Sequence, residues 1–324
     1  MTIRFAVVGC GTAANHIHLP ALRAAGAEVT VFASRSVSSA EATCGAWGSG
    51  AVVDRWEDAV TRDDVDAIVI ATPNAQHHGV AMAALRAGKH VLVDKPMACT
   101  VDEADEMIEA AADAERVLVP FHNTRFAPPF VAAAQQVQEG AIGDLAGFRV
   151  AFGHAGPQAW APRATWFFER ATSGGGCLID LGVHAIDLLR AVAGDDVTHV
   201  TAVLNGAAGD VETDAQLLVR LRAGATGSIH ASWSARPGPD HQLTLFGTEG
   251  TLHLDARTAL TLTTAGDRTK VELPETTSSP LDELLAAVRG ERAPAVTAAD
   301  GRAAVAVVGA AYRSASSGQL VEVA

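Results

Sequence analysis

A pair of glycines directly after the first apolar run restricts how this chain begins to fold. A β-branched run ends at Val8, and residues 9–14 read Gly-Cys-Gly-Thr-Ala-Ala. Gly9 permits a tight turn, Gly11 allows another group to approach the backbone closely, and the small Ala14 lets a helix pack against the strand. The segment therefore predicts a strand, a tight turn and a helix, which is how a βαβ unit begins.

The remainder of the first third alternates short β-branched runs with longer Ala-rich stretches of helical spacing. The predicted strands are residues 3–8, 28–33, 51–53, 67–71, 90–93 and 117–120. The predicted helices are residues 14–25, 38–47, 56–61, 77–87 and 101–114. Thr100 and Glu103 have the spacing of a capping box at the start of the last helix. This alternation predicts an α/β fold with a doubly wound parallel sheet, a Rossmann domain, over residues 1–121.

A different pattern begins after Phe121 and predicts a second α/β domain over residues 122–324. An alternating run at 145–152 and a helix at 175–192 come first. The strands predicted after them are residues 197–204, 215–221, 225–234, 242–246, 251–254, 259–264 and 270–273. Successive strands with few helices between them favour an open, mostly antiparallel sheet. Helical patterns at 281–288 and 299–314 follow. One arrangement open to the C-terminal helix is to pack against the first domain.

Composition argues against several classes of protein. The 37 acidic residues outnumber the 24 Lys and Arg residues, and the resulting net charge of −13 argues against nucleic acid or an anionic membrane as a partner. The four cysteines are widely spaced and form neither a disulfide framework nor a thiolate zinc site. The sequence shows no targeting segment and no run of about 20 apolar residues. We expect a soluble cytoplasmic protein.

The glycine-rich turn is typical of a dinucleotide site, because it places a helix N-terminus against the pyrophosphate. The residues predicted to contact the cofactor in this turn are Gly9, Gly11, Thr12, Ala13 and Ala14. After the second strand, where an NAD site usually has an acidic residue, the chain has Ser34 and Arg35. A hydroxyl and a guanidinium suit a 2′-phosphate, which favours NADP over NAD. The alternative is that Arg35 is a solvated loop residue.

Polar residues also follow the fourth and fifth predicted strands. The first loop reads Ala-Thr-Pro-Asn at 71–74, and the second reads Val-Asp-Lys-Pro at 93–96. Ligands of open α/β sheets bind at the carboxyl ends of the strands, so both loops are predicted to contact the cofactor. The residues concerned are Thr72, Pro73, Asn74, His77, Asp94 and Lys95. Lys95 is also placed to hold a substrate oxygen, the alternative being an ordinary surface lysine.

A third region combines three glycines at 174–176 with titratable side chains of helical spacing. Asp180, His184 and Asp187 are at positions i, i+4 and i+7, which form one face of an α-helix. An imidazole with a carboxylate one turn away suits proton transfer near neutral pH. The alternative is a partly buried helix with an internal hydrogen bond. Because no thiolate pair or His-x-x-x-His motif accompanies these residues, we predict no metal site.

Four motifs in this order resemble those of the Gfo/Idh/MocA family, the glucose-fructose oxidoreductase and inositol dehydrogenase family. They are Gly9-x-Gly11-x-x-Ala14, Ala71-Thr72-Pro73-Asn74 with His77, Asp94-Lys95-Pro96, and the triglycine followed by Asp180-x-Gly182-x-His184. Asp94 departs mildly from the family's Glu-Lys-Pro. The resemblance implies a Rossmann domain and a second domain for substrate and oligomerisation, whose open sheet forms a homodimer or homotetramer.

The resemblance further implies which residues act. Lys95, Asp180 and His184 are the implied catalytic residues and also bind substrate, with Asn123 and Arg125 near the nicotinamide or the substrate. Trp166 is placed to line a sugar face, the alternative being core packing.

The implied reaction is hydride transfer between nicotinamide and a secondary alcohol or ketone of a sugar, cyclitol or related polyol, with His184 as general acid and base. A nicotinamide-dependent glycoside hydrolase and a non-catalytic NADP-binding regulator are the two alternatives.

Overall fold

The computed structural model describes residues 2–234, 241–255, 259–275 and 277–324, which divide into two units with separate hydrophobic cores. The first unit comprises Met1–His122 and Ser278–Arg302, and the second comprises Asn123–Thr277 and Ala303–Ala324. The chain therefore divides after His122, next to the expected boundary, and later returns to the first unit for the segment that begins at Ser278.

The first unit contains a six-stranded parallel sheet with the order β3-β2-β1-β4-β5-β6. Its strands are β1 (Arg4–Val8), β2 (Glu28–Ala33), β3 (Ala51–Val53), β4 (Ala67–Ile70), β5 (His90–Val93) and β6 (Leu118–Pro120). All four residues of β4 are buried, because a parallel sheet is covered by helices on both faces. The strand order reverses between β1 and β4, so the predicted Rossmann sheet is confirmed and ligands are expected at this switch point.

Helices connect these strands close to the predicted positions. They are η1 (Ala14–His18), α1 (Leu19–Ala24), α2 (Val37–Trp47), α3 (Trp56–Val60), η2 (Asn74–Gln76), α4 (His77–Arg86), α5 (Val101–Asp113) and α9 (Pro280–Val288). The capping box of α5 is confirmed: Thr100 Oγ1 accepts the Glu103 N–H, and the Glu103 carboxylate accepts the Thr100 N–H. The expected single helix at 14–25 instead begins with a π-helical turn, because Pro20 has no N–H to donate to the preceding turn. α9 contacts β5 and β6.

The second unit contains a nine-stranded sheet with the order β14-β13-β12-β11-β7-β10-β9-β8-β15. The strands are β7 (Leu145–Gly153), β8 (Val197–Asn205), β9 (Asp214–Leu221), β10 (Thr226–Ser232), β11 (Gln242–Gly247), β12 (Gly250–Asp255), β13 (Ala259–Thr264), β14 (Asp267–Lys270) and β15 (Val321–Glu322). Only β7 and β10 pair in parallel among the described strands of this sheet. The mostly antiparallel sheet expected here is thus confirmed.

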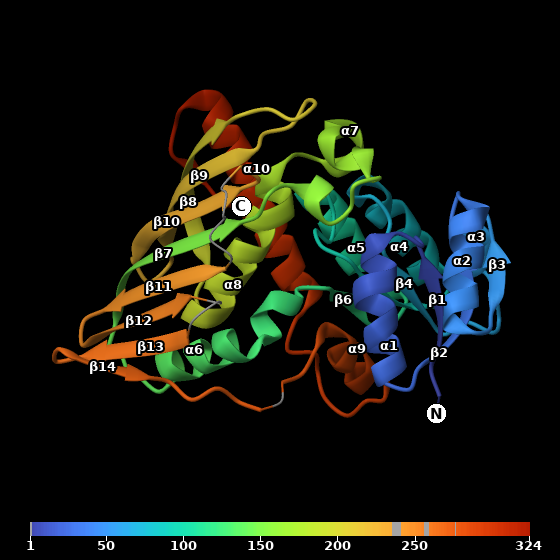
Figure 1. Ribbon diagram of the computed structural model, residues 1–324, viewed down its shortest axis with the longest axis horizontal. Coiled ribbons are helices and arrows are strands. Elements are labelled where there is room, and N and C mark those ends of the chain that lie inside the picture. The colour runs from blue at the N-terminus through green and yellow to red at the C-terminus, as the bar shows by residue number, and fades with distance from the viewer. Residues whose placement is uncertain (1, 235–240, 256–258, 276) are drawn as a thin grey trace. The chain divides into compact units, whose positions relative to one another are not determined.

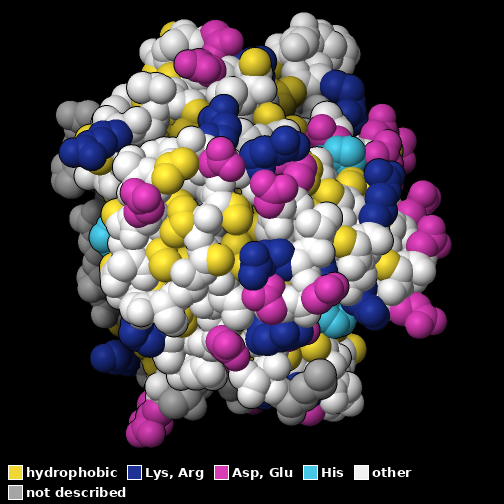
Figure 2. Space-filling view, turned by 90° about the vertical axis from the view of Figure 1, so that its right-hand side faces the viewer, with side chains coloured by type: hydrophobic (Ala, Val, Ile, Leu, Met, Phe, Trp, Pro, Cys, Tyr) yellow, Lys and Arg dark blue, Asp and Glu magenta, His cyan; other side chains and the backbone are white. Residues whose placement is uncertain are grey.

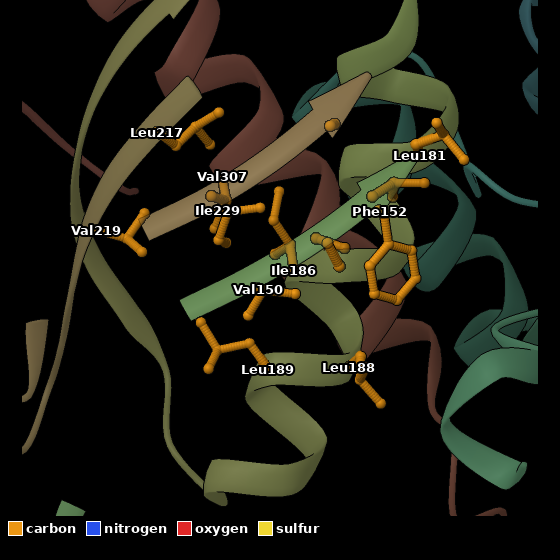
Figure 3. Packing of buried hydrophobic residues seen from close by; sticks show 14 of the residues in the cluster. Val150, Phe152, Leu181, Ile186, Leu188, Leu189, Leu217, Val219, Ile229 and Val307 are labelled. Carbon is orange, nitrogen blue, oxygen red and sulfur yellow. The ribbon is translucent and has the colours of Figure 1, made fainter. Parts of the chain in front are cut away.

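Helices α6, α8 and α10 lie along one face of this second sheet (Figure 1). The helical segments of the unit are η3 (Asn123–Phe126), α6 (Pro128–Gln138), η4 (Pro157–Ala159), η5 (Thr165–Phe168), α7 (Arg170–Ser173), η6 (Leu178–Gly182), α8 (Val183–Ala193) and α10 (Ala298–Ser317), whose first residues belong to the first unit. Figure 3 shows Ile186 and Leu189 of α8 packed against Val150 of β7 and Ile229 of β10. This core fixes α8 on the centre of the sheet.

One local expectation was wrong, and one helix was missed. The last strand was expected at 270–273 but is β14, because Ala265 and Gly266 have φ angles of 50° and 90° and form a two-residue hairpin turn. Thr264 therefore pairs with Asp267, and the strand begins directly after the turn. The helix α6 was not predicted: Pro128 and Pro129 form its first turn, where the missing N–H groups cost no hydrogen bond.

Acidic and basic side chains are interspersed with hydrophobic ones on the face shown in Figure 2, without a block of one sign. None of the helices in the described part of the chain is both long and apolar enough to span a bilayer.

Candidate active site

The glycine turn leaves room for a ligand at one glycine and none at the other. Gly9 has a φ of 98°, and a Cβ there would lie 2.3 Å from the Ala71 carbonyl oxygen. A Cβ on Gly11 would have no described atom within 4 Å, so the backbone there is open to an approaching group. Ala14 is fully buried against the sheet, and no side chain caps the helix that follows Ala13. The open backbone beside an uncapped helix start fits a pyrophosphate.

The residues expected to bind the ribose of the cofactor directly follow β2. Arg35 is exposed, and Ser34 is half-buried with its Oγ accepting the Ser36 N–H at 3.2 Å. Both side chains follow β2 at the carboxyl edge of the sheet, next to the glycine turn, because the Gly9 N–H donates to the Ala33 carbonyl at 2.9 Å. The preference for NADP stays a prediction.

His77 links the two loops after β4 and β5. Its ring is completely buried, with Nδ1 2.7 Å from the Pro96 carbonyl oxygen and Nε2 2.9 Å from the Thr72 carbonyl oxygen. Burial lowers the pKa of His77, although the two carbonyls oppose this effect. The sequence assigned His77 to the cofactor, and this assignment stays a prediction; in the structure each ring nitrogen faces a backbone carbonyl, one from each loop.

Asp94 lies between a backbone amide and a buried imidazole. One carboxylate oxygen accepts the Lys95 N–H at 2.8 Å, and the other lies 3.3 Å from His18 Nε2. Burial raises the pKa of Asp94, but His18 and Lys95 outweigh it and hold that pKa at about 2. His18 is only 1% exposed, and the sequence did not single it out because its partner is 76 residues away.

The helix of the second unit does not have the regular spacing that was expected. Leu178–Gly182 is a π-helical turn in which the Val183 N–H reaches the Leu178 carbonyl, and α8 starts only at Val183. Asp180 and His184 are therefore not related by one regular α-helical turn. The regular α-helical spacing expected for Asp180, His184 and Asp187 therefore holds only from Val183 onward, and their common face stays a prediction.

Asp180 is buried and has partners that the sequence did not reveal. Its Oδ2 accepts the Trp233 indole N–H at 2.9 Å and lies 3.6 Å from His154 Nε2. His154 Nδ1 accepts the Gly156 N–H at 3.0 Å, so a neutral ring carries its proton at Nε2, toward Asp180. His154 follows β7 and Trp233 follows β10, and the parallel pairing of these two strands brings the two residues together. No local sequence pattern predicted that pairing.

His184 is the one residue from Cys177 to Leu189 that is not buried. Its Nδ1 lies 3.2 Å from Thr124 Oγ1, which limits rotation of the ring. Asp187 is paired with Arg125 through both of its oxygens, the Arg125 Nε–Asp187 Oδ2 distance being 3.0 Å. Thr124 and Arg125 therefore attach η3 to the start of α8.

The remaining predicted substrate residues lie in the same unit. Asn123 is exposed, and Trp166 is half-buried with its ring stacked on Phe167 at 3.8 Å. Arg125 has a structural partner in Asp187, and its assignment to the substrate stays a prediction. Within the described ranges, no three His, Cys, Asp or Glu residues are grouped so that they could hold a metal ion.

Comparison with known proteins identifies both units. Residues 3–122 match the family described as "Oxidoreductase family, NAD-binding Rossmann fold", and residues 130–253 match "GFO/IDH/MocA C-terminal domain". The chain is 32% identical to 1,5-anhydro-D-fructose reductase of Ensifer adhaerens, over 99% of this chain and 98% of that protein. It is 30% identical to myo-inositol 2-dehydrogenase of Thermotoga maritima, over 78% of each chain. The solved structure of GenD2 from gentamicin A biosynthesis, in complex with NAD, has a TM-score of 0.86 and 31% identity, covering 99% of this chain and 96% of that one.

Proposed function

Since this chain belongs to the Gfo/Idh/MocA family of NAD(P)-dependent oxidoreductases, we propose that its substrate is a sugar, a cyclitol or a related polyol. The relatives described above are named for 1,5-anhydro-D-fructose and myo-inositol, which supports this class. The proposed reaction transfers a hydride between a secondary alcohol or ketone of the substrate and the nicotinamide.

The cofactor is held by the first unit in this proposal. The bound nicotinamide supplies the hydride acceptor or donor. Gly11, Thr12 and Ala13 would hold the pyrophosphate, because the backbone at Gly11 is open and no side chain caps the helix that follows. Ser34 and Arg35 would bind the ribose and its 2′-phosphate, which makes NADP the favoured cofactor.

His184 carries the proposal, because it is the one residue from Cys177 to Leu189 that is not buried. With Nδ1 directed to Thr124 Oγ1, Nε2 is the ring nitrogen that exchanges a proton with substrate. It takes the hydroxyl proton as the hydride leaves the adjoining carbon, and it returns a proton to the oxygen in the reverse direction.

Lys95 and Asp180 assist this transfer. The Lys95 ammonium stabilises negative charge on the reacting oxygen. Asp180, held in place by Trp233, accepts a substrate hydroxyl and keeps the substrate in register with His184. Asn123, Arg125 and Trp166 are further proposed substrate contacts.

Replacing His184 tests this assignment. In His184→Ala we expect kcat on the preferred polyol to fall by about 10²–10⁴, the usual effect of losing one proton-transfer group. Cofactor affinity, measured by fluorescence titration, should remain unchanged, because the cofactor is assigned to the other unit. Near-normal turnover in this variant would exclude His184 as the acid and base.

The same assays separate oxidoreductase activity from the two alternatives. Reduced nicotinamide is followed by its near-ultraviolet absorbance while sugar release is followed by chromatography, over a panel of polyols and glycosides. Stoichiometric cofactor reduction supports the proposed reaction. Sugar release without net reduction identifies a hydrolase, and cofactor binding without either signal identifies a regulator.

A further inference from the structure

The structure assigns a positioning role to Glu212: we propose that its carboxylate sets the start of the helix that carries Asp180 and His184. This inference rests on the proposed function, because it concerns how the proposed active-site residues are held. The sequence motif it explains is the triglycine at 174–176, which the proposed reaction does not use.

Glu212 accepts hydrogen bonds from three successive backbone N–H groups at the start of this helix. Its Oε1 accepts the N–H groups of Gly176 at 3.0 Å and Leu178 at 3.1 Å. Its backbone carbonyl accepts the Cys177 N–H at 3.0 Å. Glu212 is only 6% exposed, so these bonds are shielded from water. A residue 34 or more positions away along the chain thus satisfies the amides that open the helix.

Such a cap is needed because the first amides of a helix have no partners within it. The residue before the π-turn, Cys177, makes no side-chain capping bond. A carboxylate is well suited to this place, since negative charge is stabilised near a helix N-terminus. Glu212 therefore supplies what the local sequence lacks.

The glycines provide the space for this arrangement. A Cβ on Gly176 would lie 1.9 Å from the Glu212 carbonyl oxygen, and a Cβ on Gly175 would lie 1.9 Å from Tyr312 Oη. The Tyr312 hydroxyl donates to Glu212 Oε1 at 2.8 Å. Burial and the neighbouring carboxylate raise the pKa of Tyr312, so the phenol stays protonated and remains a donor. Close packing on Glu212 and Tyr312 accounts for both glycines.

The cap is connected directly to the proposed active site. The Gly176 carbonyl accepts the Asp180 N–H at 3.1 Å, so a shift of Gly176 is passed to Asp180. On the other side, Arg170 Nη2 lies 3.4 Å from Glu212 Oε2 and balances its charge. Glu212 touches neither Asp180 nor His184 through these bonds, and it acts through the backbone of the helix.

Glu212→Gln tests the proposal, because it keeps the size of the side chain but removes the charge and turns one acceptor into a donor. We expect kcat to fall by about 10²-fold, as small displacements of reacting groups do, with unchanged cofactor affinity. The pH at which kcat is half-maximal should shift as well, because the environment of His184 changes. The matched control is Asp210→Asn, the same chemical change at an exposed carboxylate that accepts the Arg170 N–H at 2.7 Å.

A merely structural role would lower the amount of active protein without moving the pH profile. An unchanged profile, or a kcat within twofold of the control, therefore overturns the proposal. Should Glu212→Gln not fold, Tyr312→Phe replaces it: loss of one neutral hydrogen bond to Oε1 should lower kcat by about 2- to 10-fold, and an unchanged kcat overturns the proposal. His184→Ala distinguishes failure of the proposed function from failure of the positioning role. If His184→Ala loses turnover while the Glu212 and Tyr312 variants do not, only the positioning role of Glu212 fails.

Discussion

Asp94 shows how much a single carboxylate depends on its neighbours. His18 and the Lys95 amide are both bonded to it, and its pKa is held at about 2 although burial acts in the opposite direction. The residue therefore stays ionised over the whole range in which a folded enzyme works. The ionised carboxylate accepts the Lys95 N–H and so restrains the start of the loop after β5.

A pH-dependent stability follows from this carboxylate. The pKa of an unfolded Asp is about 3.9, so the lowered value in the folded state stabilises the protein at every pH above that. The stabilisation is lost as the pH falls from about 4 to about 2, because the carboxylate then takes up a proton in the folded state too. In Asp94→Asn we expect the free energy of unfolding at neutral pH to decrease by about 2 kcal/mol.

Urea denaturation of both proteins across this pH range measures the effect. The difference between wild type and Asp94→Asn should shrink toward zero as the pH approaches 2. Asp63→Asn is the control, because it makes the same chemical change at an exposed carboxylate of the same unit. A difference that does not change with pH would contradict the stabilising role of Asp94.

Arg35 is the residue on which the choice of cofactor depends in our proposal. In Arg35→Ala we expect the ratio of kcat/KM for NADP to that for NAD to fall by about 10- to 100-fold. This is the effect expected from losing hydrogen bonds to a charged phosphate. Steady-state kinetics with both cofactors measure this ratio. Arg55→Ala, at another exposed arginine of the same unit, should leave it unchanged. An unaltered ratio in Arg35→Ala would remove this side chain from cofactor selection.

Among the elements, the start of α5 was predicted to the residue, and its capping box gives the physical reason. Thr100 and Glu103 satisfy each other's amides, and a capping box requires only two residue types at a fixed spacing. η6 was not predictable in this way, because its cap comes from Glu212 and its π-helical turn has no marker in the local sequence. β14 was misplaced for a local reason, since the positive φ angles of Ala265 and Gly266 decided where the hairpin turned.

The capping box of α5 predicts a measurable stability. Thr100→Ala removes the side-chain acceptor for the Glu103 amide, and we expect it to lower the free energy of unfolding by about 1 kcal/mol. The control is Thr61→Ala, at an exposed threonine that caps no helix start, where the change should be within about 0.5 kcal/mol. Thermal and urea denaturation report both values. Equal effects of the two substitutions would show that the cap adds no stability.

At the scale of the whole molecule, three strands of the second sheet carry large apolar side chains that are exposed. Val203 on β8 and Leu218 on β9 are 67% and 62% exposed, and Phe246 on β11 is 43% exposed. Large apolar side chains gathered on one exposed face are typical of a surface that another protein copy covers. We propose a homodimer or homotetramer formed through this sheet.

Charges placed on this face test the assembly. Val203→Glu combined with Leu218→Glu should convert the oligomer to a monomer in sedimentation velocity, because two carboxylates become buried without partners. Leu273→Glu is the control, since this exposed leucine follows β14, at the opposite edge of the sheet from β8. An oligomer that survives the double substitution would place its interface elsewhere.

The amino-acid sequence by itself determined the first unit and the residues of the glycine turn. Each βα segment there is a local pattern, a β-branched run followed by helical spacing, and Gly9 follows from a turn that only glycine tolerates. Tertiary structure alone decided which side chains meet: His18 with Asp94, Trp233 with Asp180, and Glu212 with the triglycine. These partners are separated by tens of residues and are brought together by strand order and sheet pairing, which hydrophobic periodicity does not specify.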